Sequence, residues 1–416
     1  MKTLLQYPIL TALISLSYTL YSQTGPGGVG DASTNVLWLD ASQLNLNNGD
    51  PVSNWPDISG NSNDAIQSNS TNQPTYLVSA INGKPGITFD GVDDYLDLTN
   101  HISSTEQSVF MINEVTGNAI HSAQLAYVSD GANLNSYYHG KCGFWYTNIF
   151  KSAGIVSFNS PFCLNVIVNH NVNTLELGTN NIFTNTTYPG FPTKSRSVVG
   201  ANYSDGLSQY RNFINGKISE IIVYNTEINN AQRIIVNNYL ANKYQITSSF
   251  RDIYYNSNQY FHEVCGIGQI NGQSHTDSKG TGEVEIYAPT SLNDGEFLFI
   301  GHNNNDLSVV SDIPLNTSTG GRWNRVWKWQ ETGNIGNYSI TFYLGTNGFG
   351  TDNNQYYIIA DDNGVFSDGG QSLIGPGVFN SSNNTVTFSN IRLPYLYFTL
   401  MNKSYEIYSV QSGNWE

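Results

Sequence analysis

The stretch that decides the fold is Lys217-Ile218-Ser219-Glu220-Ile221-Ile222-Val223-Tyr224. It first alternates between polar and apolar residues and then becomes fully apolar, which is typical of an inner strand of a β-sandwich. Directly after it, the apolar period changes from two residues to three or four. The chain therefore predicts a strand that is followed by a helix.

This helix is expected over about residues 229–244, with Asn225-Thr226 as its cap. Its apolar stripe consists of Ile228, Ala231, Ile235 and Tyr239, widened by Val236 and Leu240. A stripe at helical spacing packs against a core. A single helix that closes a run of strands indicates the end of a domain.

Upstream of this stretch, short apolar runs lie between Asn-, Gly-, Asp- and Pro-rich turns. Strands are expected at 36–39, 86–89, 108–112 and 164–168. The glycine-rich segment 24–30 predicts a flexible linker, which with Gln23 precedes the first domain.

Residues 248–403 begin a second series of strands. They are expected at 283–287, 296–300, 325–330, 338–344, 356–360, 385–389 and 395–400, which suggests a second β-sandwich. Trp323, Trp327 and Trp329 alternate along the chain and are expected on one strand face, in the core of that sandwich. The predicted class is all-β, with two sandwiches and one helix between them.

Composition limits the partners of this chain. It has 17 basic and 32 acidic residues, a net charge of −15, and only 12% charged residues against about 25% in an average domain. A nucleic-acid partner is not expected, because phosphate binding needs clustered Lys and Arg. The 13% aromatic content argues against disorder.

The N-terminus predicts export. Lys2 precedes an apolar core of about 15 residues, and small and polar residues follow it, so 1–22 is expected to be a signal peptide. No later stretch is long and apolar enough to be expected to span a bilayer. We therefore expect a secreted or cell-surface protein, in which Cys142 and Cys163 could pair as a disulfide.

Two blocks of sequence carry a resemblance to a known family. The first block consists of Leu37-Trp38-Leu39-Asp40-Ala41, Trp55-Pro56-Asp57-Ile58-Ser59-Gly60-Asn61-Ser62-Asn63-Asp64-Ala65, Gly83-Lys84-Pro85 and Phe89-Asp90-Gly91-Val92-Asp93-Asp94-Tyr95-Leu96. The second block joins Ile218–Asn225 to the helix end Tyr239-Leu240-Ala241-Asn242-Lys243-Tyr244. Together they resemble a laminin-G-like, concanavalin A-like jelly-roll domain of the bacterial secreted type. The resemblance covers about residues 31–247 and implies two antiparallel sheets packed face to face.

Residues 248–403 resemble an uncharacterised β domain that follows this jelly roll in exported surface proteins of Gram-negative gliding bacteria. The matching blocks are Gly266-Ile267-Gly268, Gly295-Glu296-Phe297-Leu298-Phe299-Ile300-Gly301-His302 and Arg325-Val326-Trp327-Lys328-Trp329-Gln330. Such proteins commonly end in a sorting module for type IX secretion. Residues 404–416 look like the start of a further module or a tail, so we expect a fragment of a longer protein.

Acidic and amide residues form two groups that suit calcium, which takes six to eight oxygen ligands. Asp57, Asn61, Asn63 and Asp64 form the first group, and Asp90, Asp93 and Asp94 form the second. Laminin-G-like relatives often hold one calcium at a loop edge. The alternative is turn chemistry, in which Asp and Asn bind their own backbone.

Exposed aromatic rings next to amides would suit the apolar faces and polar edges of pyranose rings. The candidates are Trp55, Tyr137, Tyr138, Trp145 and Tyr146, for which core packing is the alternative.

Signals for catalysis are weak. The Glu-x-Asp-x-x-Glu pattern of jelly-roll glycosidases is missing, Glu220 is alone on its strand, and Glu283 and Glu285 lack a third acid. His262, Cys265 and His275 are too few for a typical zinc site.

These observations favour a non-catalytic secreted or cell-surface binding or adhesion protein that recognises a polysaccharide or glycoprotein, with calcium as the one candidate cofactor. Two alternatives remain open. The chain could be an accessory module of a truncated carbohydrate-degrading enzyme, or a purely structural surface protein.

Overall fold

The computed structural model describes residues 24–102, 104, 106–116, 121–128, 133–138, 141–146, 149–155, 159–168, 173–177, 181–185, 196–204, 207–246, 253–254, 259–313, 320–346, 349 and 355–403. Between 121 and 155 and between 164 and 185 it describes backbone pairing, and of the side chains there only that of Leu125. The predicted signal peptide (1–22) and tail (404–416) lie outside the described residues.

The first half of the chain forms two antiparallel sheets that pack face to face. The described strands of sheet one are β1 (Asn35–Asp40), β4 (Thr75–Ile81), β5 (Lys84–Asp90), β7 (Gln107–Val115), β12 (Phe162–Val168), β13 (Asn173–Leu177), β14 (Asn181–Asn185) and β18 (Asn215–Tyr224). Those of sheet two are β2 (Asn54–Trp55), β3 (Ala65–Ile66), β6 (Leu96–Leu98), β8 (His121–Val128), β9 (Asn133–Tyr138), β10 (Lys141–Tyr146), β11 (Ile149–Ile155) and β15 (Arg196–Val199). A small ribbon joins β16 (Asn202–Ser204) to β17 (Gln209–Arg211).

The second half forms another pair of sheets. The described strands of sheet three are β19 (His262–Ile270), β20 (Gln273–His275), β23 (Phe297–His302), β24 (Val309–Val310), β25 (Gly320–Trp323), β26 (Trp327–Thr332), β28 (Gln355–Asp361), β29 (Ser372–Ile374) and β32 (Tyr397–Lys403). Those of sheet four are β21 (Asp277–Ser278), β22 (Val284–Tyr287), β27 (Tyr338–Tyr343), β30 (Val378–Asn380) and β31 (Thr385–Ile391). Three short 3-10 helices complete the described elements: η1 (Pro26–Gly28), η2 (Ala41–Gln43) and η3 (Ser70–Asn72).

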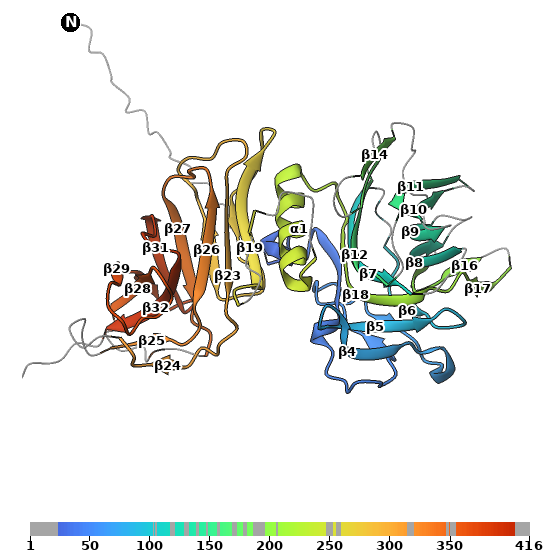
Figure 1. The fold of residues 1–416 in the computed structure, drawn as a ribbon, viewed down its shortest axis with the longest axis horizontal. Coiled ribbons are helices and arrows are strands. Elements are labelled where there is room, and N and C mark those ends of the chain that lie inside the picture. Colours follow the sequence, from blue (N-terminus) through green and yellow to red (C-terminus); the bar gives the residue numbers. More distant parts are fainter. Residues whose placement is uncertain are drawn as a thin grey trace, which may run out of the picture.

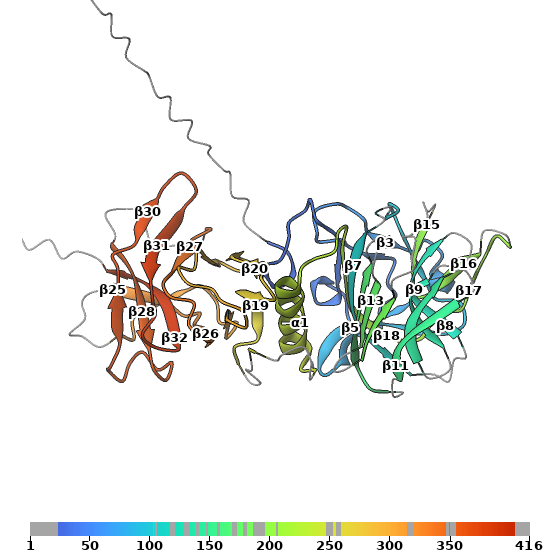
Figure 2. The same ribbon diagram turned by 90° about the horizontal axis from the view of Figure 1, so that it is seen from above.

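Helix α1 (Asn230–Tyr244) forms a separate layer between the two sandwiches (Figures 1 and 2). One apolar cluster joins three surfaces: the outer face of sheet one (Phe110, Ile222), helix α1 (Ile235) and sheet three (Phe297, Phe299). The predicted all-β class, with two sandwiches and one helix, is confirmed.

The helix starts at a different cap from the expected Asn225-Thr226. The Asn229 side chain accepts from the Gln232 N–H, and the Gln232 side chain accepts from the Asn229 N–H, which is a capping box. The predicted stripe is correct, since Ile228, Ala231, Ile235, Val236, Tyr239 and Leu240 are all buried. Burial extends around most of the helix because both sandwiches pack on it.

The same layer explains the apolar run of β18. Ile221 and Val223 point into the first sandwich, whereas Ile222 and Tyr224 point outward against α1. The run is fully apolar because both faces of the strand are covered. A register shift between Ile218 and Glu220 reverses the alternation, so that Glu220 faces the helix layer rather than the sandwich core.

The predicted flexible linker is a packed segment. Residues 25–30 are buried, and the Gly27 and Gly28 carbonyl oxygens lie 3.1 Å from Ser278 Oγ and 2.8 Å from His275 Nε2. Gly28 has a positive φ of 76°, and a Cβ there would lie 1.9 Å from Ser278 Oγ. These glycines allow a close backbone approach instead of providing flexibility.

The second sandwich core contains the predicted tryptophans. Trp323 and Trp327 are almost fully buried, and Trp329 packs against the same cluster. The expectation that all three share one strand is wrong, because Trp323 lies in β25 and the other two in β26.

Candidate functional site

A buried carboxylate lies where sheet one meets α1. Glu220 is fully buried, and four donors surround it: Trp38 Nε1 (2.7 Å), Tyr239 Oη (2.8 Å), Tyr244 Oη (2.8 Å) and Lys243 Nζ (2.7 Å). Lys243 Nζ also donates to Asp40 Oδ2 at 2.6 Å. A buried charge is tolerated when its oxygen atoms are paired and hydrogen-bonded, as they are here.

Electrostatics link these groups closely. Burial raises the pKa of Glu220, while the ammonium of Lys243 opposes that rise. Burial also disfavours the charge of Lys243, but Asp40 and Glu220 outweigh it and raise the pKa of Lys243. Lys243 therefore stays a cation and holds two carboxylates. The pairing ties α1 to β1 and β18.

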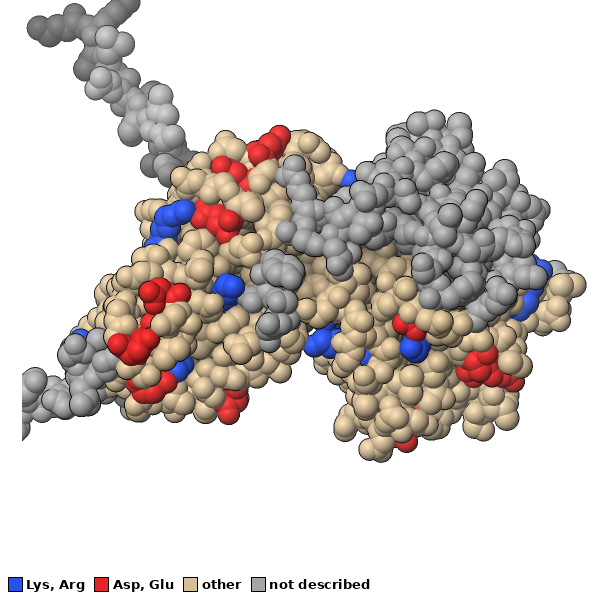
Figure 3. All heavy atoms as spheres, viewed as in Figure 1, with Lys and Arg blue, Asp and Glu red and all other residues tan. Residues whose placement is uncertain are grey.

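This network borders a cleft of about 650 Å³ between the two halves. Its first wall comes from β1, η2 and the start of β5, and includes Trp38, Gln43 and Lys84. Its second wall comes from the start of β19 and from the loop after β23, and includes Phe261, His262 and Asn304. Figure 3 shows a notch between the halves on one face, with Lys or Arg atoms in it.

A second hollow of about 410 Å³ adjoins the cleft. It shares Phe261 and His262 with the cleft and adds the amide side chains of Gln259, Asn303 and Asn305. Ligand sites in proteins commonly measure about 300–1,000 Å³ and combine an apolar surface with a few polar groups. Each of the two hollows lies within this size range, and the cleft combines the ring of Phe261 with polar side chains.

A bulge shapes the second wall. The pairing of β19 with β23 shifts register between His262 and Cys265, and Glu263 has a positive φ of 48°. Glu263 Oε2 lies 2.8 Å from His302 Nε2. Burial acts to raise the pKa of Glu263, but His302 and Arg325 together outweigh it and lower that pKa. Burial, together with His302, lowers the pKa of His262 to about 4. At neutral pH His262 therefore presents an uncharged imidazole to the cleft.

His262, Cys265 and His275, which were considered for zinc, have different surroundings. His275 Nε2 is 2.8 Å from the Gly28 oxygen, whereas His262 lines the cleft. Burial raises the pKa of the Cys265 thiol to about 12, which opposes the thiolate form that binds metals.

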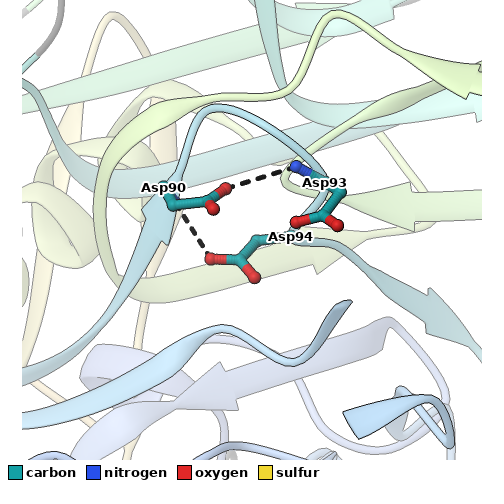
Figure 4. A group of neighbouring side chains, drawn as sticks. All are labelled: Asp90, Asp93 and Asp94. Carbon is teal, nitrogen blue, oxygen red and sulfur yellow. Dashed lines mark hydrogen bonds between the residues drawn. The ribbon is translucent and has the colours of Figure 1, made fainter. Parts of the chain in front are cut away.

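The two groups of predicted calcium ligands, seven residues in all, differ in geometry. Within the described part of the chain, the one group with clustered ligand atoms is Asp90, Asp93 and Asp94, whose carboxylate oxygens lie within 4.8 Å of one another (Figure 4). Asp90 Oδ1 accepts from the Asp93 N–H at 3.3 Å, and Asp94 Oδ2 accepts from the Asp90 N–H at 2.9 Å. Burial above all, with the charges of Asp90 and Asp93, raises the pKa of Asp94 to about 6.

The other acidic group has turn geometry. Asp57 accepts from the N–H groups of Trp38 (2.9 Å), Ser59 (3.0 Å) and Asn63 (3.0 Å). Asp64 Oδ1 accepts from the Asp57 N–H at 2.9 Å, and Asn63 Nδ2 donates to the Val36 oxygen at 2.7 Å. This segment corresponds to the turn alternative.

The predicted aromatic sugar site is only partly within the described structure. Trp55 is fully buried in the first sandwich core, so its ring is not accessible to a sugar and its assignment was wrong. Tyr137 and Tyr138 lie in β9, and Trp145 and Tyr146 lie in the adjacent β10. Their side chains lie outside the described residues.

The disulfide considered between Cys142 and Cys163 does not form. Cys163 is a buried thiol in sheet one, in the cluster that contacts α1, and its Sγ lies 3.8 Å from Asn237 Oδ1. Cys142 belongs to β10 of sheet two.

The two acids of the second half also have structural partners. Arg325 Nη1 donates to Glu283 Oε2 at 2.8 Å, and the Tyr343 hydroxyl donates to Glu285 Oε2 at 2.6 Å. Sequence reasoning missed the cleft, including Lys84 and Phe261. The available signal was Glu220, a lone acid directly before the apolar run 221–224 of its strand.

Comparison with protein families gives one match. A family described as a domain of unknown function (DUF8202) matches residues 232–395, which is less than half of the chain. The match begins inside α1, so it includes part of the helix layer with the second half. No similar sequence is found among the curated proteins.

Solved structures give distant likenesses. Domain 4 of AbnA, an extracellular GH43 arabinanase from Geobacillus stearothermophilus in complex with arabinotriose, is 12% identical over 49% of this chain and 97% of that one, with a TM-score of 0.36. A Ruminococcus gnavus IT-sialidase CBM40 bound to α2,3-sialyllactose is 11% identical over 35% and 91%, with a TM-score of 0.30.

A Trypanosoma rangeli sialidase in complex with sialic acid is 14% identical over 54% of this chain, with a TM-score of 0.37. This chain spans only 36% of that sialidase. At these TM-scores the likenesses assign neither a fold family nor an activity to the chain. No helix among the described residues has the length and apolar character needed to cross a bilayer.

Proposed function

We propose that this protein is a non-catalytic secreted or cell-surface protein that binds carbohydrate, as a polysaccharide or a glycoprotein, through the cleft between its two halves. The mixed lining of the cleft carries the proposal: the half-buried Phe261 supplies ring surface, and Gln43 and Asn304 supply amides. Saccharides have apolar C–H faces and polar edges, and both kinds of group are needed to hold them.

The state of the cleft carboxylates supports binding over hydrolysis. Asp40 is held by Lys243 at 2.6 Å, and Glu263 is held by His302 at 2.8 Å. Glycosidases need one carboxyl group with a raised pKa to protonate the leaving group. The pKa of Glu263 is lowered instead, so it is unsuited to that role.

Export supports the same proposal. The expected signal peptide at 1–22 and the laminin-G-like resemblance of 31–247 both fit a protein that meets polysaccharides outside the cell. Sequencing the N-terminus of the protein from the culture medium and the cell surface tests this step. A mature N-terminus near Gln23 is expected, and a cytoplasmic protein that retains Met1 would contradict it.

The binding itself is tested on a glycan array with residues 23–416. We expect binding to at least one glycan class, and about a 5-fold loss in the Phe261→Ala variant, because aromatic contacts contribute about 0.5–1.5 kcal/mol beyond their buried area. Phe379→Ala is the matched control, since Phe379 is a half-buried phenylalanine of the second sandwich outside the cleft. A folded protein that binds no glycan would overturn the proposal and favour a structural surface role.

A further inference from the structure

Lys84 differs from the other charged groups at the cleft. Asp40, Lys243 and Glu263 each have a partner of opposite charge within 4.0 Å or a charge-assisted hydrogen bond. No carboxylate of the described residues forms an ion pair with Lys84. Its Nζ instead lies 4.1 Å from the centroid of the Phe261 ring, across the cleft between the two halves.

The electrostatic surroundings disfavour the charge of Lys84, because the cleft carboxylates Asp40 and Glu263 are engaged by other cations. Burial, followed by the ammonium of Lys243, lowers the pKa of Lys84. Lys243 is already occupied by Asp40 and Glu220. A half-buried ammonium next to another cation is costly unless an anion joins it, so the cleft is suited to a negatively charged group.

The cleft continues from Lys84 towards neutral hydrogen-bonding groups. Phe261 and His262 connect it to the hollow formed with Gln259, Asn303 and Asn305. Among the described residues that line the cleft, Lys243 is paired with carboxylates and His262 is uncharged at neutral pH, so Lys84 is the cation that remains for a ligand. A ligand with one negative group at Lys84 and hydroxyl groups at the amide side chains would bind both the cleft and the adjoining hollow.

We propose that the cleft binds an anionic saccharide, whose carboxylate or sulfate group pairs with Lys84 while its hydroxyl groups bind the amide side chains of the adjoining hollow. This inference rests on the proposed carbohydrate-binding function and names the ligand class of the same site. It makes Lys84 the residue that distinguishes charged from neutral saccharides.

The test compares polymers that differ only in charge. Residues 23–416 are titrated with polygalacturonate and with its methyl ester, and with dextran sulfate and dextran. We expect the protein to bind one of the charged polymers about 10-fold more tightly than its neutral counterpart, because hydrogen bonds to charged groups are the stronger class. The polygalacturonate and dextran sulfate arms separate a carboxylate from a sulfate ligand.

Three variants assign the effect to the cleft. Lys84→Gln should lower the affinity for the charged polymer about 10-fold, to that of the neutral one, and Lys84→Arg should restore most of it. Lys328→Gln is the matched control, because Lys328 is also half-buried and lies 5.7 Å from the centroid of the Tyr397 ring, away from the cleft. Melting temperatures check that all variants fold.

The outcomes separate this inference from the function on which it rests. Equal affinity for charged and neutral polymers, glycan binding restricted to neutral sugars, or an undiminished affinity of Lys84→Gln would overturn the inference and leave carbohydrate binding in place. Failure to bind any of the polymers or any arrayed glycan would overturn both.

Discussion

Replacing Lys243 by Met removes the only cation from the buried network and keeps most of the side-chain volume. Glu220 is fully buried and Asp40 is 3% exposed, so neither carboxylate can recover its hydration by a small movement. Removing one partner of a buried ion pair typically costs about 3–5 kcal/mol. Three neutral donors remain around Glu220, and we therefore expect the lower part of this range, about 3 kcal/mol, at pH 8.

The cost should depend on pH in a defined direction. Without Lys243, burial and Asp40 both act to raise the pKa of Glu220 above its ordinary value of 4.5. A carboxyl group with a raised folded pKa contributes stability below its unfolded pKa and loses it as the pH rises through the folded pKa. The destabilisation should therefore be largest at pH 8 and shrink towards pH 5.

Urea unfolding of residues 23–416 at pH 5 and pH 8, monitored by tryptophan fluorescence, measures the loss of stability and its dependence on pH. A Lys243→Met, Glu220→Gln double variant completes a double-mutant cycle. Removing both charges should recover a substantial part of the stability that Lys243→Met loses at pH 8. A loss below 1 kcal/mol at pH 8, or a loss that does not decrease at pH 5, would refute the reasoning.

Three further predictions follow from other sites. Gly28→Ala should lower the free energy of unfolding in urea by about 2 kcal/mol more than Gly49→Ala does. Both positions have a positive φ, but of the two only Gly28 has atoms within 4 Å of a new Cβ. Equal losses would contradict the close packing of residues 25–30. Calcium at about millimolar concentration should raise the melting temperature of the wild type but not of Asp93→Asn. The effect should fade below the Asp94 pKa of about 6. A variant that responds to calcium like the wild type would exclude Asp90, Asp93 and Asp94 as the calcium site. Burial, together with the neighbouring Glu285 carboxylate, raises the pKa of Asp277 to about 7, so the contribution of Asp277 to stability falls as the pH rises through 7. Asp277→Asn should therefore raise the melting temperature more at pH 8 than at pH 5, and a larger rise at pH 5 would contradict this reasoning.

Periodicity predicted twelve of the 32 described strands, because it reports burial directly. The seven strands expected in 248–403 all exist, with small differences at their ends. Strand β19 was missed because Gly266 and Gly268 interrupt its apolar pattern. The structure gives the reason for these glycines: a Cβ at Gly268 would lie 2.0 Å from the ring of Phe297, its partner in β23. The missing side chains make room for rings that pack on α1.

The candidate site was much less accessible to sequence reasoning. Lys84, Phe261 and Asn304 are distant in the chain, and no local pattern brings them together. The acidic groups gave a local signal, but the same residue types stabilise turns, and only Asp90, Asp93 and Asp94 form a cluster. Trp55 shows the same ambiguity, because an aromatic ring suits a sugar site or a core equally well.

The position of α1 decides which part of the chain can be studied alone. Its Asn238 Oδ1 accepts from the N–H groups of Ile253 (2.9 Å) and Tyr254 (3.0 Å), and its Asn229 Nδ2 donates to the Ser274 oxygen at 3.0 Å. A fragment that ends at residue 247 would lose these partners together with the apolar contact to sheet three, and the second wall of the cleft.

We therefore expect residues 24–247 to fold with a helix that exposes apolar surface, to self-associate, and to lack the glycan binding of the longer chain. Analytical ultracentrifugation and the glycan array compare the fragment with residues 23–416. A monomeric fragment with full glycan affinity would show that the first sandwich contains the site by itself. It would also exclude the cleft, because a cleft with one wall cannot place Phe261 against the ligand.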